Sequence, residues 1–284
     1  MKVAHKQNIR RVLAKVYGIF PSLKNSITIL MYHSVNKNMP YSVTPEMFDY
    51  QMQILARDYY VLRICDLGEL DSNAMLQSRK KIAVVTFDDG YIDNAQYALP
   101  ILKKNGIRAT FFICSGYVNK KLDITRKFIN YLDLKPLTRT HLQDLVNNGM
   151  EIGAHTVTHS MLSKLDCWQQ ENELVSSKAW LEDAIGQKVV SFAYPYGWPR
   201  SFNSNTTKLV DKYFDYCCTT IWRSNRFSDI TKLNMKALSR IRIDAFDTQR
   251  DFLNKLNGSW DYMAYIQLYA KIIEQDLRNC QVLS

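Results

Sequence analysis

Negative charge is scarce at the start of this 284-residue chain, because no aspartate or glutamate precedes Glu46. Seven of the 37 basic residues lie in that stretch, so the remaining 30 nearly balance the 27 acidic residues of the chain. The net charge of +10 is therefore a local feature of the N-terminus and not a property of the whole surface. No nucleic-acid-binding motif accompanies this charge, so we expect no nucleic-acid partner.

Cysteine pairs with a functional spacing are also absent. The six cysteines include no Cys-x-x-Cys pair, and Cys217 and Cys218 are adjacent, which does not suit ordinary disulfide geometry. Free thiols indicate a reducing compartment. No apolar run reaches the roughly 18 residues that a membrane span needs, and no cleavage site of small residues is found near the N-terminus. We therefore expect a cytoplasmic protein, either free or held peripherally on the inner face of the membrane.

No linker rich in Gly, Pro or Ser interrupts the chain, and 46% of its residues are hydrophobic. This predicts one main domain over residues 26–284 that ends in a helix, preceded by a basic amphipathic helix over residues 1–25. This first helix has apolar residues along one side, which we call its apolar stripe. The stripe has two interpretations: it packs on the domain, or residues 1–24 lie on an anionic membrane surface. The stripe consists of Ile9, Val12, Leu13, Val16, Tyr17 and Phe20.

An apolar run over residues 84–87 ends in two adjacent carboxylates, Asp88 and Asp89. Burial of two neighbouring carboxylates is costly, because each loses its hydration and they repel each other. A divalent cation removes both costs. Successive side chains of an extended chain point to opposite sides, so one carboxylate can bind a metal while the other acts as a base. His155 and His159 add two neutral imidazoles, which with a carboxylate make a three-ligand site with room for water. The pattern predicts a metal-dependent hydrolase.

Each of these motifs taken alone also has a structural explanation. Asp-Gly is a common turn pair, and His-x-x-x-His occurs by chance. No glutamate stands at position 156, where a zincin would need one. The combination of both motifs at matching strand ends favours the metal site.

Predicted strands and helices alternate along the chain, which indicates a parallel sheet. The carboxylate pair, the histidine pair, the turn after residue 193 and His33 all follow strand C-termini, where a barrel of βα units collects its active site. Thr44 and Pro45 predict the N-cap and first residue of a helix. We expect strands at 27–32, 82–87, 109–113, 151–154, 189–193 and 239–243, and helices at 94–105, 140–148, 169–185 and 204–212.

Three motifs resemble, in order and spacing, those of the polysaccharide deacetylase domain, carbohydrate esterase family four. They are residues 86–90 (Thr-Phe-Asp-Asp-Gly), 155–159 (His-Thr-Val-Thr-His) and 193–197 (Ala-Tyr-Pro-Tyr-Gly). Residues 30–35 (Leu-Met-Tyr-His-Ser-Val) resemble the opening of the branch that acts on poly-N-acetylglucosamine and related bacterial exopolysaccharides. The resemblance implies an α/β fold, an incomplete, distorted (β/α)7 barrel, and removal of N-acetyl groups from an acetamido sugar of a poly- or oligosaccharide, which could be lipid-linked.

The resemblance also implies roles for the site residues. Asp89, His155 and His159 hold the divalent metal, for which zinc is the first choice and cobalt, nickel or manganese are alternatives. Asp88 accepts the proton of the attacking water. The backbone N–H of Tyr196 faces the acyl oxygen as an oxyanion donor.

Four further residues are predicted to contact the glycan: Tyr194, Pro195 and Gly197 in a rigid turn, and Arg242 on a late strand. Among the tryptophans that follow or flank predicted elements, Trp198, Trp222 and Trp260, we expect core packing over sugar stacking.

The chain departs from the family pattern at two places. Ala193 stands where many relatives have an arginine that orients the catalytic aspartate, and residues 238–242 contain no Leu-x-His, the usual source of the general acid. Either His33 donates the proton to the leaving amine, or Asp88 returns the one it took. His33 and Arg242 are also candidates for tuning Asp88.

Three other functions fit parts of the sequence. They are a metal-dependent amidohydrolase acting on a small non-sugar amide, a catalytically silent glycan-binding module, and a membrane-surface scaffold. The intact set of Asp88, Asp89, His155 and His159 argues against the last two.

Overall fold

The structure is a computed structural model that describes residues 2–18, 26–37, 42–70, 81–119, 135–226 and 234–269. Within these ranges one sheet contains the strands β1 (Ser26–Tyr32), β2 (Tyr59–Leu62), β3 (Lys81–Phe87), β4 (Thr110–Ile113), β5 (Glu151–Ala154), β6 (Ser191–Ala193), β7 (Tyr216–Cys218), β8 (Asn225–Arg226) and β9 (Ile241–Arg242). The helices are α1 (Lys2–Tyr17), α2 (Pro45–Asp58), α4 (Leu99–Lys104), α5 (Ser115–Val118), α6 (Arg139–Asn147), α7 (Cys167–Ile185), α8 (Ser204–Tyr213) and α9 (Gln249–Leu256). Shorter turns are η1 (Cys65–Glu69), η2 (Asn94–Ala98), η4 (Leu162–Lys164) and η6 (Asn234–Lys236).

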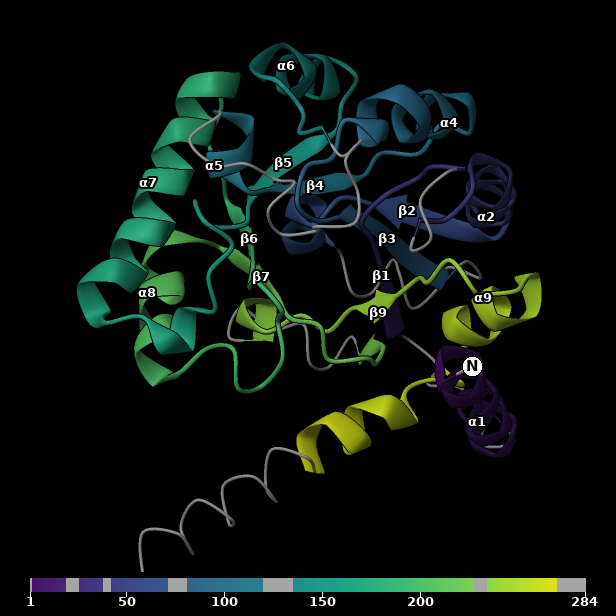
Figure 1. Ribbon diagram of the computed structural model, residues 1–284. Helices are drawn as coiled ribbons and strands as arrows, with labels where there is room; N and C mark the ends of the chain where they lie inside the picture. Colours follow the sequence, from purple (N-terminus) through teal and green to yellow (C-terminus); the bar gives the residue numbers. More distant parts are fainter. Residues whose placement is uncertain are drawn as a thin grey trace, which may run out of the picture.

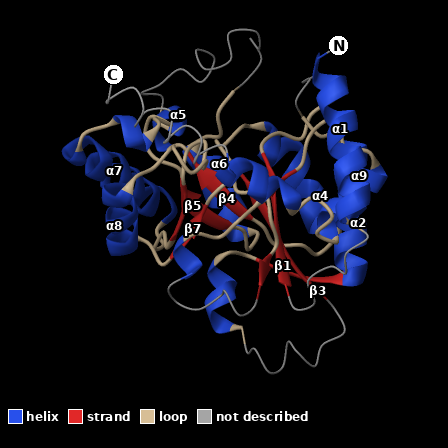
Figure 2. Cartoon of the chain, turned by 90° about the horizontal axis from the view of Figure 1, so that it is seen from below, coloured by secondary structure: helices blue, strands red, loops and turns tan. Residues whose placement is uncertain are grey.

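The sheet follows the order β7-β6-β5-β4-β3-β1-β8. All pairs along it are parallel except β1 with β8. β1 lies along one edge of β3, while β2 and β4 share the other edge, β2 at its start and β4 at its end. The sheet is curled, and helices surround its outer face (Figures 1 and 2). This arrangement confirms the predicted incomplete (β/α) barrel.

A short segment late in the chain spans the opening between the two ends of the curled sheet. Leu238 bridges to Cys218 of β7, and three residues later β9 pairs with β1. The segment therefore runs from one side of the barrel to the other, which places the residues between Leu238 and β9 over the barrel interior.

Helix boundaries follow the expected signals at several places. Thr44 accepts a hydrogen bond from the backbone N–H of Met47 with Pro45 next to it, and Gly186 ends α7 in the left-handed conformation. The helix expected at 94–105 is divided: the π-helical turn η2 precedes α4. Pro100 in the first turn of α4 has no N–H for the regular ladder, which explains the change of hydrogen-bond spacing before it.

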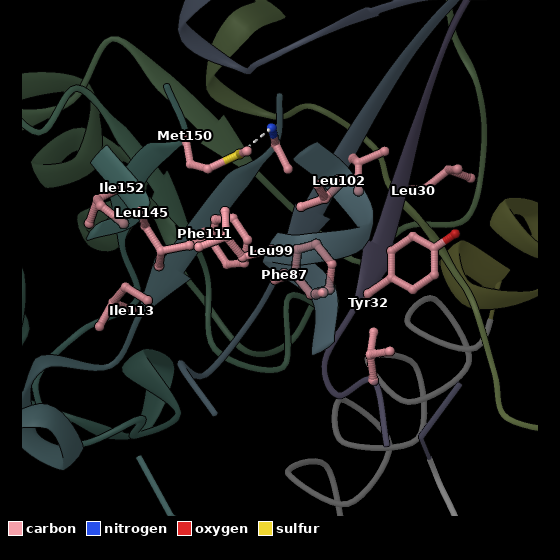
Figure 3. Close-up of a cluster of buried hydrophobic side chains, with 14 of the residues drawn as sticks. Leu30, Tyr32, Phe87, Leu99, Leu102, Phe111, Ile113, Leu145, Met150 and Ile152 are labelled. Carbon is pink, nitrogen blue, oxygen red and sulfur yellow. Dashed lines mark hydrogen bonds between the residues drawn. The ribbon is translucent and has the colours of Figure 1, made fainter. Parts of the chain in front are cut away.

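The hydrophobic core has two layers, because side chains alternate along the strands. Tyr32 and Phe87 belong to the larger cluster between the sheet and the helices, and Phe87 stacks on Phe111 with ring centroids 4.7 Å apart (Figure 3). Ile29 and Val84 belong to the second cluster inside the curled sheet. Both faces of β1 and β3 are therefore buried, so these strands are fixed in register and hold the residues at their ends in place.

α1 lies against α9 with its polar side, not with its apolar stripe (Figure 1). Ile9, Val12, Leu13 and Val16 are exposed, so the interpretation in which the stripe packs on the domain is wrong for these four residues. Tyr17 of the same stripe is partly buried against Tyr262. Phe20 and residues 270–284 of the expected C-terminal helix lie outside the described residues, although residues 262–269 are helical. Among the described helices, none is long and apolar enough to cross a membrane.

Candidate active site

Three side chains of metal-binding type meet where β3 and β5 end. Asp89 is the second residue after β3, and His155 directly follows β5 on the far side of β4. The chain then turns and brings His159 to the same place. All three are buried, and one potential ligand atom from each lies within 4.8 Å of the others. The structure thus brings together the three residues predicted as metal ligands.

The backbone around this group is strained. Asp89, Thr156 and His159 adopt left-handed φ angles of 75°, 66° and 56°. Such conformations are uncommon for non-glycine residues and cost about 1–3 kcal/mol each. The surrounding contacts hold two of the three candidate ligands in conformations that the free chain would avoid.

The donor atoms have a spacing that suits a small divalent ion. Nδ1 of His155 lies 2.7 Å from the carbonyl oxygen of Ala193, so this nitrogen carries the proton and Nε2 presents a lone pair. Nε2 of His155 lies 3.6 Å and Nε2 of His159 lies 3.2 Å from Oδ1 of Asp89. A tetrahedral zinc ion with bonds of about 2.0–2.1 Å separates its ligands by roughly 3.3 Å. The residues therefore fit a metal.

The protonation state of the site also suits a metal. Burial lowers the pKa of His155 to about 3, so its imidazole is neutral at ordinary pH. Neutral imidazole is the form that binds metals. Nδ1 of His159 is buried without a hydrogen-bond partner among the described residues.

Two residues that the sequence did not predict hold the ligands in position. Tyr91 donates a hydrogen bond from its hydroxyl to Oδ2 of Asp89 at 2.7 Å, which leaves Oδ1 facing the histidines. Glu173 of α7 accepts hydrogen bonds from the backbone N–H groups of Val157 and Thr158 at 2.8 and 2.9 Å. These contacts fix the loop between the two histidines, as the supporting shell of a metal site does.

The neighbouring carboxylate, Asp88, is paired with a buried guanidinium. Nη1 and Nη2 of Arg240 bind Oδ1 and Oδ2 of Asp88 at 2.6 and 2.8 Å, and Nε of Arg240 donates to the carbonyl oxygen of Thr219. Burial alone would raise the pKa of Asp88, but the charge and hydrogen bonds of Arg240, with the nearby histidines, hold it below its usual range. Asp88 is therefore ionised and fixed in orientation.

Arg240 is the most important site residue that the sequence reasoning missed. The sequence has Ala193 where the family pattern has an arginine, and Arg242 is the residue that it offers as a candidate for tuning Asp88. Arg240 lies on the segment that spans the barrel opening, just before β9 and two residues before Arg242. Strand alternation would place both arginines on one side, so it does not distinguish Arg240 from Arg242. Arg242 is more exposed and pairs with Asp244, with its guanidinium over the Trp222 ring.

His33 follows β1 directly and is half-buried. Its backbone carbonyl accepts a hydrogen bond from Asn94 at 2.9 Å, and its charge contributes to the lowered pKa of Asp88. Tyr32 pairs with Phe87 in the parallel register of β1 and β3, so His33 and Asp88 follow neighbouring strand ends. The loop after it is held by Ser34, which hydrogen-bonds to the buried Asp93.

The turn after β6 presents a backbone N–H beside the histidines. Tyr196 has a φ of 63°, and its ring contacts that of His159 with centroids 4.9 Å apart. Thr220 holds the turn, because its hydroxyl donates to the Tyr196 carbonyl and its N–H donates to Gly197. Among the described residues no hydrogen bond engages the N–H of Tyr196, which leaves that donor available.

The other residues of this turn lie in less accessible places. Tyr194 is in the core, stacked on Phe202, and Pro195 and Gly197 are buried. Their side chains shape the turn, and direct contact with a glycan stays a prediction. Trp198 is 51% exposed, contrary to the expected core packing, whereas Trp222 and Trp260 are buried as expected.

Comparison with known proteins supports the same conclusion as the geometry. A family model described as polysaccharide deacetylase matches residues 76–215. This range contains the candidate metal ligands, Asp88 and Tyr196, and it ends before Arg240.

Individual relatives extend the likeness over most of the chain. YxkH of Bacillus subtilis (strain 168) is 30% identical over 190 residues, which are 66% of this chain and 61% of that protein. The poly-beta-1,6-N-acetyl-D-glucosamine N-deacetylase of Staphylococcus epidermidis is 27% identical over 61% of this chain and 66% of its own length. This chain thus aligns with less than two thirds of either relative.

A solved structure gives a wider match. The Streptococcus pyogenes deacetylase PplD, in complex with acetate, superposes with a TM-score of 0.69 at 27% identity. The superposition covers 82% of this chain and 99% of PplD, so the likeness includes the whole barrel of that protein.

Proposed function

This chain belongs to the polysaccharide deacetylase family, and from that premise we propose that it is a metal-dependent hydrolase that removes N-acetyl groups from acetamido sugars of a bacterial poly- or oligosaccharide. The observation that carries the proposal is the grouping of Asp89, His155 and His159 next to an ionised carboxylate, Asp88, that a buried arginine orients. Together these groups provide a metal site and a base at the open end of the barrel.

The metal that we propose is zinc, held by Asp89, His155 and His159. Two imidazoles and one carboxylate are a common set for catalytic zinc, and three protein ligands leave a position for water or substrate. When bound there, the ion supplies Lewis acidity, which polarises the acyl carbonyl and lowers the pKa of water. Tyr91 and Glu173 keep the ligands in place. Cobalt, nickel and manganese accept the same donors, so the test includes them.

Asp88 acts as the general base in this proposal. Each carboxylate oxygen has two lone pairs, and Arg240 uses one on each oxygen. A lone pair therefore stays free to accept the proton of the attacking water. The low pKa keeps Asp88 ionised before the reaction, while the bidentate contact prevents the carboxylate from turning toward the metal ligands.

Tyr196 and His33 complete the proposed machinery. The N–H of Tyr196 donates a hydrogen bond to the oxyanion that develops on the acyl carbon. The amine must be protonated to leave, and His33 donates that proton from the strand end next to the one that Asp88 follows. If Asp88 returns its proton instead, His33 serves only to orient or bind.

The substrate class rests on the relatives and on the surface beside the site. One relative acts on poly-beta-1,6-N-acetyl-D-glucosamine by name, and we propose an N-acetylated glycan for this chain too. Tyr196 is 45% exposed next to His159, and Trp198 is exposed two residues later. Exposed aromatic rings of this kind offer apolar faces on which sugar rings can stack.

The experiment that tests the function measures acetate release from a panel of N-acetylated oligosaccharides. The purified protein is stripped of metal and reloaded separately with zinc, cobalt, nickel or manganese. We expect release only from the reloaded protein, and only with acetamido sugars. Release from small non-sugar amides at equal or higher rates would identify an amidohydrolase, and binding without release would identify a silent glycan-binding module.

A further inference from the structure

The apolar stripe of α1 faces away from the barrel. Ile9, Val12, Leu13 and Val16 are 41–60% exposed. Their spacing of three and four residues places them on one side of the helix. An amphipathic helix on a globular domain normally turns this side to the core. The outward direction exposes a continuous row of large aliphatic side chains. Such a row differs from the single exposed apolar residues that are scattered over ordinary protein surfaces.

Specific contacts on the opposite side fix this orientation. Gln7 donates from its side chain to Oδ1 of Asp247 at 3.1 Å, and Arg11 binds Asp251 through Nη2 at 2.7 Å and Nε at 3.0 Å. Ala14 on the same side is buried. Rotation of α1 to bury its stripe would break these buried and half-buried polar pairs, so the outward stripe is a defined feature of the fold.

A second exposed apolar segment lies next to α1. The hydroxyl of Tyr262 donates to the backbone carbonyl of Arg10 at 2.9 Å, and the rings of Tyr17 and Tyr262 are 6.0 Å apart. Gln267, in the helix that contains Tyr262, accepts a hydrogen bond from the N–H of Trp222 and donates one to the carbonyl oxygen of Thr220. The exposed side chains of this segment are Tyr265, Ile266, Leu268 and Tyr269.

The charge beside these apolar residues is positive. α1 contains five basic residues and no acidic one. Lys15 is exposed, and Arg10 and Arg11 are half-buried. The acidic neighbours of α1 are on its docked side, where Asp251 is already paired with Arg11.

We propose that this face, which we call the basic apolar face, docks on an anionic lipid surface. It consists of Ile9, Val12, Leu13 and Val16 of α1, and the segment with Tyr265, Ile266, Leu268 and Tyr269 begins next to it. The apolar side chains match the acyl chains of such a surface, and the basic residues beside them match its anionic headgroups. Tyrosines favour the boundary between these two layers. A second copy of this chain is a poorer partner, because it would place equal positive charges opposite one another.

The position of the face can be compared with that of the open end of the barrel. In Figure 2, α1 stands beside α9 and extends to the same edge of the molecule as α5, which follows the carboxyl end of β4. One end of α1 and the open end of the barrel thus lie toward the same edge of the molecule. This inference does not depend on the proposed hydrolase activity, since it concerns a separate surface.

The test is co-sedimentation of the full chain with vesicles of phosphatidylcholine alone or mixed with phosphatidylglycerol. We expect the wild type to pellet with the mixed vesicles at low salt and to be released at high salt. A Val12→Ser/Val16→Ser double variant should bind at least tenfold more weakly, and Lys15→Glu should also weaken binding. The matched control is Trp168→Ser/Val175→Ser, which removes exposed apolar side chains from α7 and should bind like the wild type.

Circular dichroism and acetate release from a soluble substrate check that each variant is folded, since none of these residues lies in the site. Wild type that stays in the supernatant with both kinds of vesicle would overturn the proposal, as would equal binding by the Val12→Ser/Val16→Ser variant. A dimer in light scattering that this variant abolishes, without vesicle binding, would assign the face to a second copy instead.

Discussion

Arg240 binds both carboxylate oxygens of Asp88 although the two residues are 152 positions apart in the chain. Both are buried, and the guanidinium also lies over the ring of Phe112 with 5.2 Å to its centroid. A buried bidentate pair fixes the carboxylate more firmly than a single ammonium could, because the planar fork matches the geometry of the two oxygens. The late segment that crosses the barrel opening therefore contributes directly to the site on β3.

The first prediction follows from the charge of Arg240. In Arg240→Met the pKa of Asp88 should rise, because burial raises the pKa of a carboxyl group and the charge of Arg240 no longer opposes it. The base is active above its pKa, so the acidic limb of the kcat/KM profile should move to higher pH. The measurement is the pH profile of acetate release.

The control for this prediction is a second buried pair. Lys255 and Asp247 are both buried and ion-paired, outside the candidate site. Loss of one partner from a buried pair costs about 3–5 kcal/mol, so Lys255→Met should lower the unfolding temperature as Arg240→Met does. Only Arg240→Met should move the acidic limb. An unmoved limb would show that Arg240 is merely structural.

The second prediction concerns metal content. With two imidazoles and one carboxylate as ligands, the purified chain should hold about one divalent ion. Elemental analysis after dialysis should show its loss in His155→Ala and in His159→Ala. His141→Ala is a suitable control, because this histidine caps α6 away from the site and its removal should leave the metal in place. Equal metal in all four proteins would refute the ligand assignment.

The third prediction separates the two adjacent carboxylates. Asp88→Asn should keep the metal but lose about 10²–10⁴-fold in kcat, because a missing general base typically has that effect. Asp89→Asn should lose both metal and activity, since Asp89 is the carboxylate that lies beside the histidines. Metal content and kcat are measured on the same preparations. Near-normal turnover of Asp88→Asn would require another residue as the base.

Much of the fold could be predicted from the sequence because its signals are local. Apolar runs marked β1 and β3, Thr44 and Pro45 marked the start of α2, and Gly186 marked the end of α7. The π-helical turn before Pro100 could not be foreseen, because a proline in a helical pattern indicates a local break in the hydrogen-bond ladder but not which spacing replaces it. A helical pattern also could not predict the direction in which the α1 stripe faces, because polar contacts to α9 and to Asp247 before it determine that direction.

The candidate site also has one part that the sequence predicts and another part that it does not. The carboxylate and histidine pairs sit within short motifs, and the structure brings them together as expected. The supporting residues act through contacts across the sheet or from a distant helix, and no local sequence pattern predicts such contacts. These residues are Arg240, Tyr91 and Glu173. The membrane surface and the cytoplasmic location stay proposals. The five cysteines of the described part form no disulfide with one another, and Cys280 lies outside that part.

The last prediction addresses the proton that the leaving amine needs. His33 is half-buried directly after β1, beside the end of β3 that Asp88 follows. If His33 donates this proton, His33→Gln should slow an acetamido sugar by about 10²–10⁴-fold, as expected for loss of a general acid. An activated acetyl ester should be slowed far less, because its leaving group departs without protonation. The glutamine keeps a polar side chain of similar length, and metal content should be unchanged. Equal slowing of amide and ester would assign His33 to binding or to the structure of its loop, and Asp88 would then return the proton that it took from water.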